Sequence, residues 1–302
     1  MISLWIPITI AAAFLQCVRT ALQKRLVGSV GTDAANFVRY LYGAPLAALV
    51  LAGLAIFGSE PIPVPEARFY ALAALGGMAQ IVATSCLILA FTLRNFAVGT
   101  TLSKTETVQT ALMATVFLAE PLGLLAWAAI LISLIGVLLL SLPARAGGLA
   151  DLWRGIGERA ALFGLASGGL FGLSAVGIRG ASLSLPEGSF VVRAFLTLAF
   201  ITAFQSVVMA VWLLWRDRPA LFKPVRLWRE AAPVGLLSVI GSAGWFTAMT
   251  LQNAAYVRAV GQVELIFTLI VSRYGFGERP TSREIGGIIL VAGGVIVLLI
   301  GR

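Results

Sequence analysis

The sequence contains no histidine, so it lacks the commonest general base and transition-metal ligand of proteins. It has only two cysteines, Cys17 and Cys86, and both fall inside apolar stretches. Neither a disulfide framework nor a thiolate metal cluster is therefore expected. The phosphate-binding patterns GxxxxGKS and GxxxxGKT are absent as well. These absences exclude most hydrolase and oxidase chemistry, predict no metal and no cofactor, and leave carboxylates to carry any proton transfer.

Charged residues are also scarce, since they make up 12% of the 302 positions while apolar residues make up 59%. An ordinary soluble domain is about 45–50% apolar, so a soluble enzyme is nearly excluded. The net charge of +9 could suggest a nucleic-acid partner, but the basic residues lie in short segments between apolar stretches and form no basic domain. The composition instead predicts an all-α, polytopic membrane protein.

Ten apolar stretches approach the length of about 20 residues that a helix needs to cross a bilayer. They cover 4–22, 34–57, 69–91, 97–118, 122–142, 160–181, 188–215, 231–251, 254–274 and 285–300. The first has the length of a signal peptide, but it lacks a basic start and contains Pro7, Gln16 and Arg19, so we interpret it as the first span. Because lipid offers no partner to unpaired backbone groups, all ten are expected to be transmembrane helices.

The two halves of the sequence repeat each other. One constant offset places Glu106 on Glu264 and also aligns the apolar, glycine-containing segments near the end of each half. We therefore expect a first repeat at 1–143, a connecting loop at 144–159 and a second repeat at 160–302. Because each repeat holds an odd number of spans, the second must enter the bilayer upside down, which is the inverted-repeat plan of many secondary transporters.

Glutamate recurs in the fourth helix of each repeat (Glu106 and Glu264) and again where that helix ends (Glu120 and Glu278), and a glycine-containing helix closes each repeat. In these features, and over essentially its whole length, the sequence resembles the ten-helix EamA type of the drug/metabolite transporter superfamily. The resemblance implies transport of small metabolites across the bacterial cytoplasmic (inner) membrane, often export of amino acids or related compounds, without ATP. It also implies that the chain is not an enzyme.

The glutamates Glu106 and Glu264 lie near the middle of their expected helices and hence near the bilayer midplane. Carboxylates at that depth usually face the bundle interior or a wet cavity, where burial favours the protonated form and suits reversible protonation. Family members commonly carry proline directly after this glutamate, but Thr107 and Leu265 stand there, so no proline kink is assumed. We expect both glutamates to bind substrate or a proton; the alternative is that they only hold helices together by accepting bonds from Ser, Thr or Lys104.

Other polar residues share the faces of these glutamates. In the first repeat, Ser103, Gln109 and Thr110 lie on the same helical face as the glutamate by their three- and four-residue spacing. In the second repeat, Thr268 follows its glutamate by four residues. These faces are predicted to line a polar cavity.

Three further residues are candidate ligands. Lys104 projects away from the glutamate face, and its match in the second repeat is Gln262, so its charge is present in one repeat only. This asymmetry is typical of a ligand for a substrate carboxylate, although an ion pair between helices explains it equally well. Trp245 lies beside Gly241 and Gly244, where its ring could wall a cavity or simply pack against the glycines.

Two arginines occupy matching positions near the start of the second helix of each repeat, Arg39 and Arg193. We interpret them as residues that snorkel to the interface or pair with Asp33 and Glu187. Arg19, in the first span, has no charged counterpart, and the sequence assigns it no role.

Together these features predict a secondary-active transporter that exports a small polar or zwitterionic metabolite by alternating access around a midplane cavity, with a proton-linked glutamate. The alternatives are a passive facilitator, a lipid scramblase or a structural membrane protein. An intramembrane enzyme is disfavoured because no nucleophile or metal ligand accompanies the two glutamates. Expected partners are a small metabolite, membrane lipid and protons, without nucleic acid, and both a monomer and a homodimer remain open.

Loop charge predicts the orientation. Basic residues in the loops after the odd-numbered spans far outnumber those assigned to the other side, which are Arg68, Arg179, Arg258 and Arg302. Short loops rich in Lys and Arg stay in the cytoplasm, so both termini are predicted to lie outside the cell. The family resemblance would instead place both termini in the cytoplasm.

Overall fold

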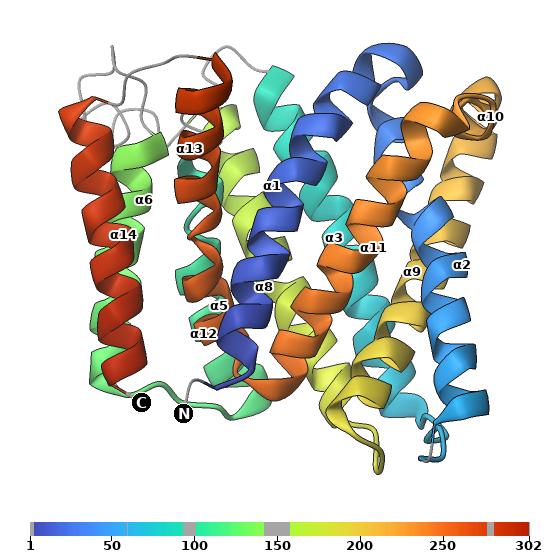
Figure 1. The fold of residues 1–302 in the computed structure, drawn as a ribbon, viewed down its shortest axis with the longest axis horizontal. Coiled ribbons are helices and arrows are strands. Elements are labelled where there is room, and N and C mark those ends of the chain that lie inside the picture. Colours follow the sequence, from blue (N-terminus) through green and yellow to red (C-terminus); the bar gives the residue numbers. More distant parts are fainter. Residues whose placement is uncertain (1–2, 59, 93–100, 142–157, 277–280, 302) are drawn as a thin grey trace. The chain divides into compact units, whose positions relative to one another are not determined.

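The computed structural model describes the chain except for residues 1–2, 59, 93–100, 142–157, 277–280 and 302, and the described residues form helices and no strand (Figure 1). The helices are α1 (Trp5–Val30), α2 (Thr32–Phe57), α3 (Ala67–Thr92), α5 (Glu106–Leu118), α6 (Leu124–Ser141), α8 (Arg159–Leu183), α9 (Phe190–Arg216), α10 (Arg218–Arg226), α11 (Trp228–Leu251), α12 (Ala254–Gly261), α13 (Glu264–Phe276) and α14 (Ser282–Ile300). The expected connecting loop at 144–159 lies almost wholly outside the described residues.

Eight of these helices, α1, α2, α3, α6, α8, α9, α11 and α14, are long and apolar enough to cross a membrane. They confirm the predicted all-helical, polytopic membrane protein. The other four are short, with 13 residues in α5, 9 in α10, 8 in α12 and 13 in α13. The expected fourth and ninth spans coincide with these shorter pieces, so the ten-span arrangement stays a prediction.

The first helix is longer than its apolar stretch. We expected it to end near residue 22, but α1 continues to Val30, where Gly31 ends α1 and begins α2. Gly31 has φ 87°, a conformation that favours glycine, so the chain reverses within one residue. The expected end was wrong because the polar residues after Leu22 continue the helix beyond the apolar segment.

Packing divides the chain differently from the sequence repeats. Unit 1 comprises Met1–Gly77 and Gly177–Gln252, and unit 2 comprises Met78–Val176 and Asn253–Arg302. Each unit therefore contains segments of both repeats. The division follows helix pairs that join the repeats: α1 packs on α11 and α2 on α9 in unit 1, whereas α6 packs on α14 and α5 on α12 in unit 2.

In unit 1, the matching second helices of the two repeats run antiparallel. The start of α2 meets the end of α9, because Arg216 Nε lies 3.9 Å from Asp33 Oδ2. At the other end, the backbone N–H of Ser189, just before α9, donates to Glu60 Oε2 at 2.6 Å, just after α2. Opposite directions for equivalent helices are what inverted repeats require.

The expected partners of the two matched arginines are different in the structure. Asp33 pairs with Arg216 instead of Arg39, and no described carboxylate pairs with Arg193. The Cζ atom of Arg39 instead lies 5.5 Å from the centre of the Tyr40 ring. The pairing part of our interpretation is therefore wrong, because packing of α9 on α2 brings Arg216 of another helix to Asp33.

In unit 2, the matching fifth helices, α6 and α14, also run antiparallel, with glycine at their contact. A Cβ atom on Gly136 would lie 2.7 Å from the carbonyl oxygen of Gly287. A Cβ atom on Gly294 would lie 2.8 Å from the carbonyl oxygen of Ala129. Small residues at these positions let the two backbones approach closely, as is typical of helix pairs in lipid.

Candidate functional site

The helical segment that carries the repeated glutamate is interrupted just before that glutamate in both repeats. In the first repeat, residues 101–103 are helical, Lys104 and Thr105 form a turn, and α5 begins at Glu106. In the second repeat, α12 ends at Gly261, two turn residues follow, and α13 begins at Glu264. The expectation of one continuous helix around each glutamate is therefore wrong.

The interruption forms without proline. In the first repeat, the N–H groups of Lys104 and Thr105 donate to carbonyls three residues back, at 3.1 Å each, so the last turn is tightened. The hydroxyl of Thr105 also donates to the carbonyl of Leu102 at 2.7 Å. Such side-chain bonds compete with the helical ladder and bend helices.

The second repeat ends its first half-helix in the same way. The N–H of Gln262 donates to the carbonyl of Ala259 at 3.2 Å, and that of Val263 donates to Val260 at 3.1 Å. Gly261, the last residue of α12, has a low helix propensity, which favours termination at this point. At its other end, α12 is fixed by Asn253, whose side-chain oxygen accepts the N–H of Ala255 at 2.8 Å.

The interruption brings Glu106 of the first repeat against Arg258 of the second, both in unit 2. Arg258 Nε lies 3.0 Å from Glu106 Oε1, and the side chains are 14% and 18% exposed, respectively. Glu106 is the first residue of α5, and Arg258 lies in the last turn of α12. The negative charge of Glu106 thus lies at the positive end of the α5 dipole, and the positive charge of Arg258 lies near the negative end of the α12 dipole. Both arrangements are stabilising.

A second bond joins the same two half-helices. The side-chain amide of Gln262 donates to Thr107 Oγ1 at 2.6 Å, from the turn after α12 to the first turn of α5. Thr107 is the residue that stands where family members commonly have proline, and it is 2% exposed. A hydroxyl at this position thus provides a contact between the repeats that a proline could not.

The other predicted residues of the first-repeat face are held by protein contacts. The amide of Gln109 donates to Thr105 Oγ1 at 2.8 Å and to the carbonyl of Leu165, in α8, at 3.3 Å. Thr110 is fully buried, and its hydroxyl donates to the carbonyl of Glu106 at 2.7 Å. Ser103 is 7% exposed.

Glycines of α8 allow this close packing. A Cβ atom on Gly168 would lie 2.8 Å from the carbonyl oxygen of Ser103, and one on Gly172 would lie 2.9 Å from Thr110 Oγ1. α8 therefore supports the turn before Glu106 and the first turns of α5 from behind. This contact orients the carboxylate-bearing end of α5.

The second repeat copies part of this arrangement. Thr268 donates its hydroxyl to the carbonyl of Glu264 at 2.9 Å, as Thr110 does to Glu106, but the Thr268 side chain is exposed. Glu264 is half-buried at the first residue of α13. The two glutamates thus share backbone positions and differ in their surroundings.

Two predicted ligands lie apart from the ion pair. Lys104 occupies the turn before α5 and is half-buried, and no described carboxylate lies within ion-pair distance of it. Trp245 belongs to α11 of unit 1 and is 8% exposed. The neighbouring Gly244 contacts Ala12 of α1, as expected for glycines at a helix contact.

Arg258 is the site residue that sequence analysis missed. We counted it as a loop cation, although it falls inside the apolar stretch expected as the ninth span. Arg179, counted in the same way, lies in α8, is 9% exposed and donates to the carbonyl of Met249 at 2.7 Å. A cation inside an expected span is a functional candidate by default, and that rule would have identified Arg258.

Comparison with known families and solved structures shows what this chain is similar to. The model of the EamA-like transporter family matches residues 3–142 and again 158–300, which together cover almost the whole chain. No curated protein sequence matches. A solved structure titled "Crystal structure of protein" aligns over 100% of both chains with a TM-score of 0.76 at 15% sequence identity, a likeness that shows the fold alone. Among the described residues, no three His, Cys, Asp or Glu side chains gather into a metal site.

Proposed function

Because the chain belongs to the EamA-like transporter family, we propose that it is a secondary-active transporter that exports a small zwitterionic metabolite of amino-acid type across the cytoplasmic membrane. The observation that supports this substrate class is the ion pair between Glu106 and Arg258, one residue from each repeat. Both side chains are mostly buried but still reachable, and they meet where two half-helices end.

A zwitterion matches this pair by charge balance. Its ammonium group binds to Glu106 and its carboxylate to Arg258, so each protein charge exchanges one partner for another. A ligand with a single charge would leave either Glu106 or Arg258 buried and unpaired. Leaving one member of this partly exposed pair without a partner costs about 2 kcal/mol, which corresponds to about 30-fold discrimination.

This proposal transfers the role of carboxylate ligand from Lys104 to Arg258. Lys104 has no basic counterpart in the second repeat, and Arg258 has none in the first repeat, where Thr100 stands at the matching position. The asymmetry that favoured a substrate ligand thus applies equally to Arg258, which in addition lies 3.0 Å from Glu106. The proposal keeps Glu264 as a supporting residue and assigns proton coupling to it by its symmetry with Glu106.

The test is counterflow transport by the purified protein in proteoliposomes. A panel of amino acids is compared with single-charge analogues of the same size, such as alanine against propionate and ethylamine. We expect exchange only with zwitterions, loss of exchange in Glu106→Gln and Arg258→Met, and partial retention in Arg258→Lys. Equal exchange of a single-charge analogue, or wild-type rates in Glu106→Gln, would contradict the proposal.

A further inference from the structure

The short helix α10 has no role in the proposed site, and its sequence was expected to be a loop. It lies in unit 1 between two helices long enough to cross a membrane, α9 and α11, and its own 9 residues are too few to cross one. Its buried residues are Ala220 and Pro224, and it packs against α2 and α9. Tyr42 of α2 donates its hydroxyl to the carbonyl of Pro224 at 3.0 Å. The helix is therefore fixed to the protein.

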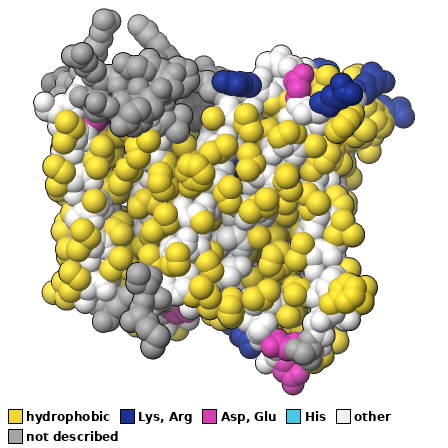
Figure 2. Space-filling view, in the orientation of Figure 1, with side chains coloured by type: hydrophobic (Ala, Val, Ile, Leu, Met, Phe, Trp, Pro, Cys, Tyr) yellow, Lys and Arg dark blue, Asp and Glu magenta, His cyan; other side chains and the backbone are white. Residues whose placement is uncertain are grey.

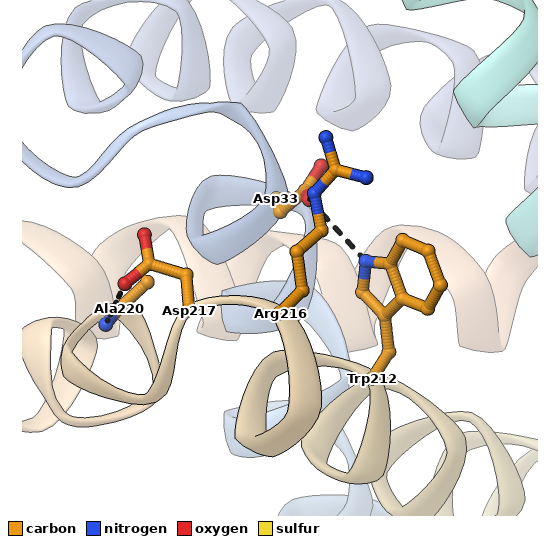
Figure 3. A network of polar contacts seen from close by, with 5 residues as sticks. All are labelled: Asp33, Trp212, Arg216, Asp217 and Ala220. Carbon is orange, nitrogen blue, oxygen red and sulfur yellow. Dashed lines mark hydrogen bonds and ion pairs between the residues drawn. The ribbon is translucent and has the colours of Figure 1, made fainter.

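Polar contacts fix the corner where α9 meets α10 (Figure 3). Asp217 caps α10, since its carboxylate accepts the N–H of Ala220 at 3.3 Å. One turn earlier, Trp212 Nε1 donates to Asp33 Oδ2 at 3.3 Å, and Arg216 lies over the Trp212 ring at 5.4 Å. The cap explains why the segment between the expected spans 188–215 and 231–251 is helical and not a loop.

The outer side of this corner is strongly basic. Figure 2 shows Lys and Arg side chains gathered at the end of unit 1 where α10 lies. The exposed cations are Arg216, Arg218, Lys223, Arg226 and Arg229. The carboxylates of the same corner are Asp33, which pairs with Arg216, Asp217, which caps α10, and Glu230, which accepts the hydroxyl of Ser29 at 3.3 Å. The five cations outnumber these three carboxylates, so the surface has a positive excess.

Large apolar side chains are exposed among these cations. Trp215 is 80% exposed, Phe222 48%, Val225 56% and Trp228 57%. The guanidinium of Arg229 lies 5.7 Å from the centre of the Trp228 ring. Tryptophan together with Lys and Arg is typical of residues at the level of lipid headgroups. A free anion would use the cations but would leave these rings in water.

We infer that α10 and the adjoining ends of α9 and α11 form a docking surface for the headgroups of anionic phospholipids. The cations bind the phosphodiester and the exposed rings enter the acyl boundary beside it, as in helices that lie in the plane of a membrane. This role differs from an effect of the same charges on orientation, because orientation is set during insertion and needs no lipid affinity in the folded protein. It is also independent of the transported substrate.

The experiment is native mass spectrometry of the detergent-solubilised full chain, titrated with dioleoylphosphatidylglycerol or dioleoylphosphatidylcholine. We expect the wild-type protein to prefer phosphatidylglycerol. Each cation at a membrane surface contributes about 5-fold to affinity for anionic lipid, so Lys223→Gln/Arg226→Gln should weaken binding by about 25-fold. The variant Lys223→Arg/Arg226→Lys, which keeps both charges, should bind as the wild type does.

A matched control removes the same charge elsewhere. Arg68→Gln/Arg159→Gln changes two exposed cations at the starts of α3 and α8, and its phosphatidylglycerol affinity should be unchanged. Wild-type affinity in Lys223→Gln/Arg226→Gln would overturn the inference, and so would equal binding of the two lipids. Displacement of the bound lipid by millimolar glycerol 3-phosphate would identify a site for a free anion and would overturn the lipid assignment too.

Discussion

Neutralising either member of the Glu106–Arg258 pair should destabilise the protein, whereas neutralising both should cost no more than one. At 3.0 Å and an effective dielectric constant of about 20, the attraction between the two charges has an upper limit of about 5.5 kcal/mol. Desolvation of both groups and their partial exposure of 14% and 18% reduce the net value. We expect about 2 kcal/mol of destabilisation for Glu106→Gln, for Arg258→Met and for the double variant alike.

The pair therefore has an expected coupling energy of about 2 kcal/mol in a double-mutant cycle, within the range found for residues in contact. The assay is the free energy of unfolding in detergent micelles graded with sodium dodecyl sulfate, measured for the wild type and the three variants. Glu66→Gln, an exposed carboxylate just before α3, is the control for neutralisation as such and should change little.

A coupling energy below about 0.5 kcal/mol would refute the reasoning, because it would mean that the ion pair contributes no more than an exposed surface pair. The same variants separate stability from transport. The double variant should unfold like either single variant and still fail to exchange zwitterions. Retained exchange in a stable double variant would show that the pair is structural and that the substrate binds elsewhere.

Three further outcomes are expected. Gly294→Leu should destabilise the protein by about 2–3 kcal/mol, because the leucine side chain would meet the backbone of α6. Gly293 faces open space, so Gly293→Ala should be tolerated. Equal losses of unfolding free energy in the two variants would contradict this packing. Asp33→Asn should change the unfolding free energy by less than about 1 kcal/mol, since the Arg216–Asp33 side chains are 63% and 45% exposed, and a larger loss would indicate a buried role. Orientation can be tested with single cysteines at the exposed positions 64 and 225, after replacement of the native cysteines, and an impermeant thiol reagent in intact cells. If both termini lie outside, the reagent should label position 64 and should not label position 225. The reverse pattern would place the termini in the cytoplasm.

The large features of the fold could be predicted because lipid exposes them in the composition. Each long helix needs an uninterrupted apolar segment, so the spans appear in the sequence as stretches of the right length. The inverted arrangement follows from counting spans and matching rare charges such as Glu106 and Glu264. The antiparallel contacts of α2 with α9 and of α6 with α14 agree with an inverted arrangement of these helices.

The interruption before each glutamate could not be predicted in the same way. It depends on a hydrogen bond from Thr105 to Leu102 and on the low helix propensity of Gly261, and threonine and glycine are too common in membrane helices to signal a break. Proline, the strong signal, is absent at both places. The sequence therefore shows one apolar stretch where the structure has two half-helices.

The partner of Glu106 was missed for a different reason. Helical periodicity relates residues on one element, but Arg258 meets Glu106 only because α12 packs against α5. No local pattern contains that contact. Loop charge was also counted by position along the chain, which assigned Arg179 and Arg258 to the outside although both lie within helices.

The ion pair also links substrate binding to conformational change under the proposed function. Glu106 belongs to α5 and Arg258 to α12, so any movement that separates these half-helices must break their ion pair and leave two mostly buried charges unpaired. A zwitterion that binds both groups removes this cost, because each charge keeps a partner while the half-helices move apart. The empty form of a transporter must resist the change between its two conformations. The loaded form must permit that change. Under the proposed function, the Glu106–Arg258 pair supplies that difference through charge balance.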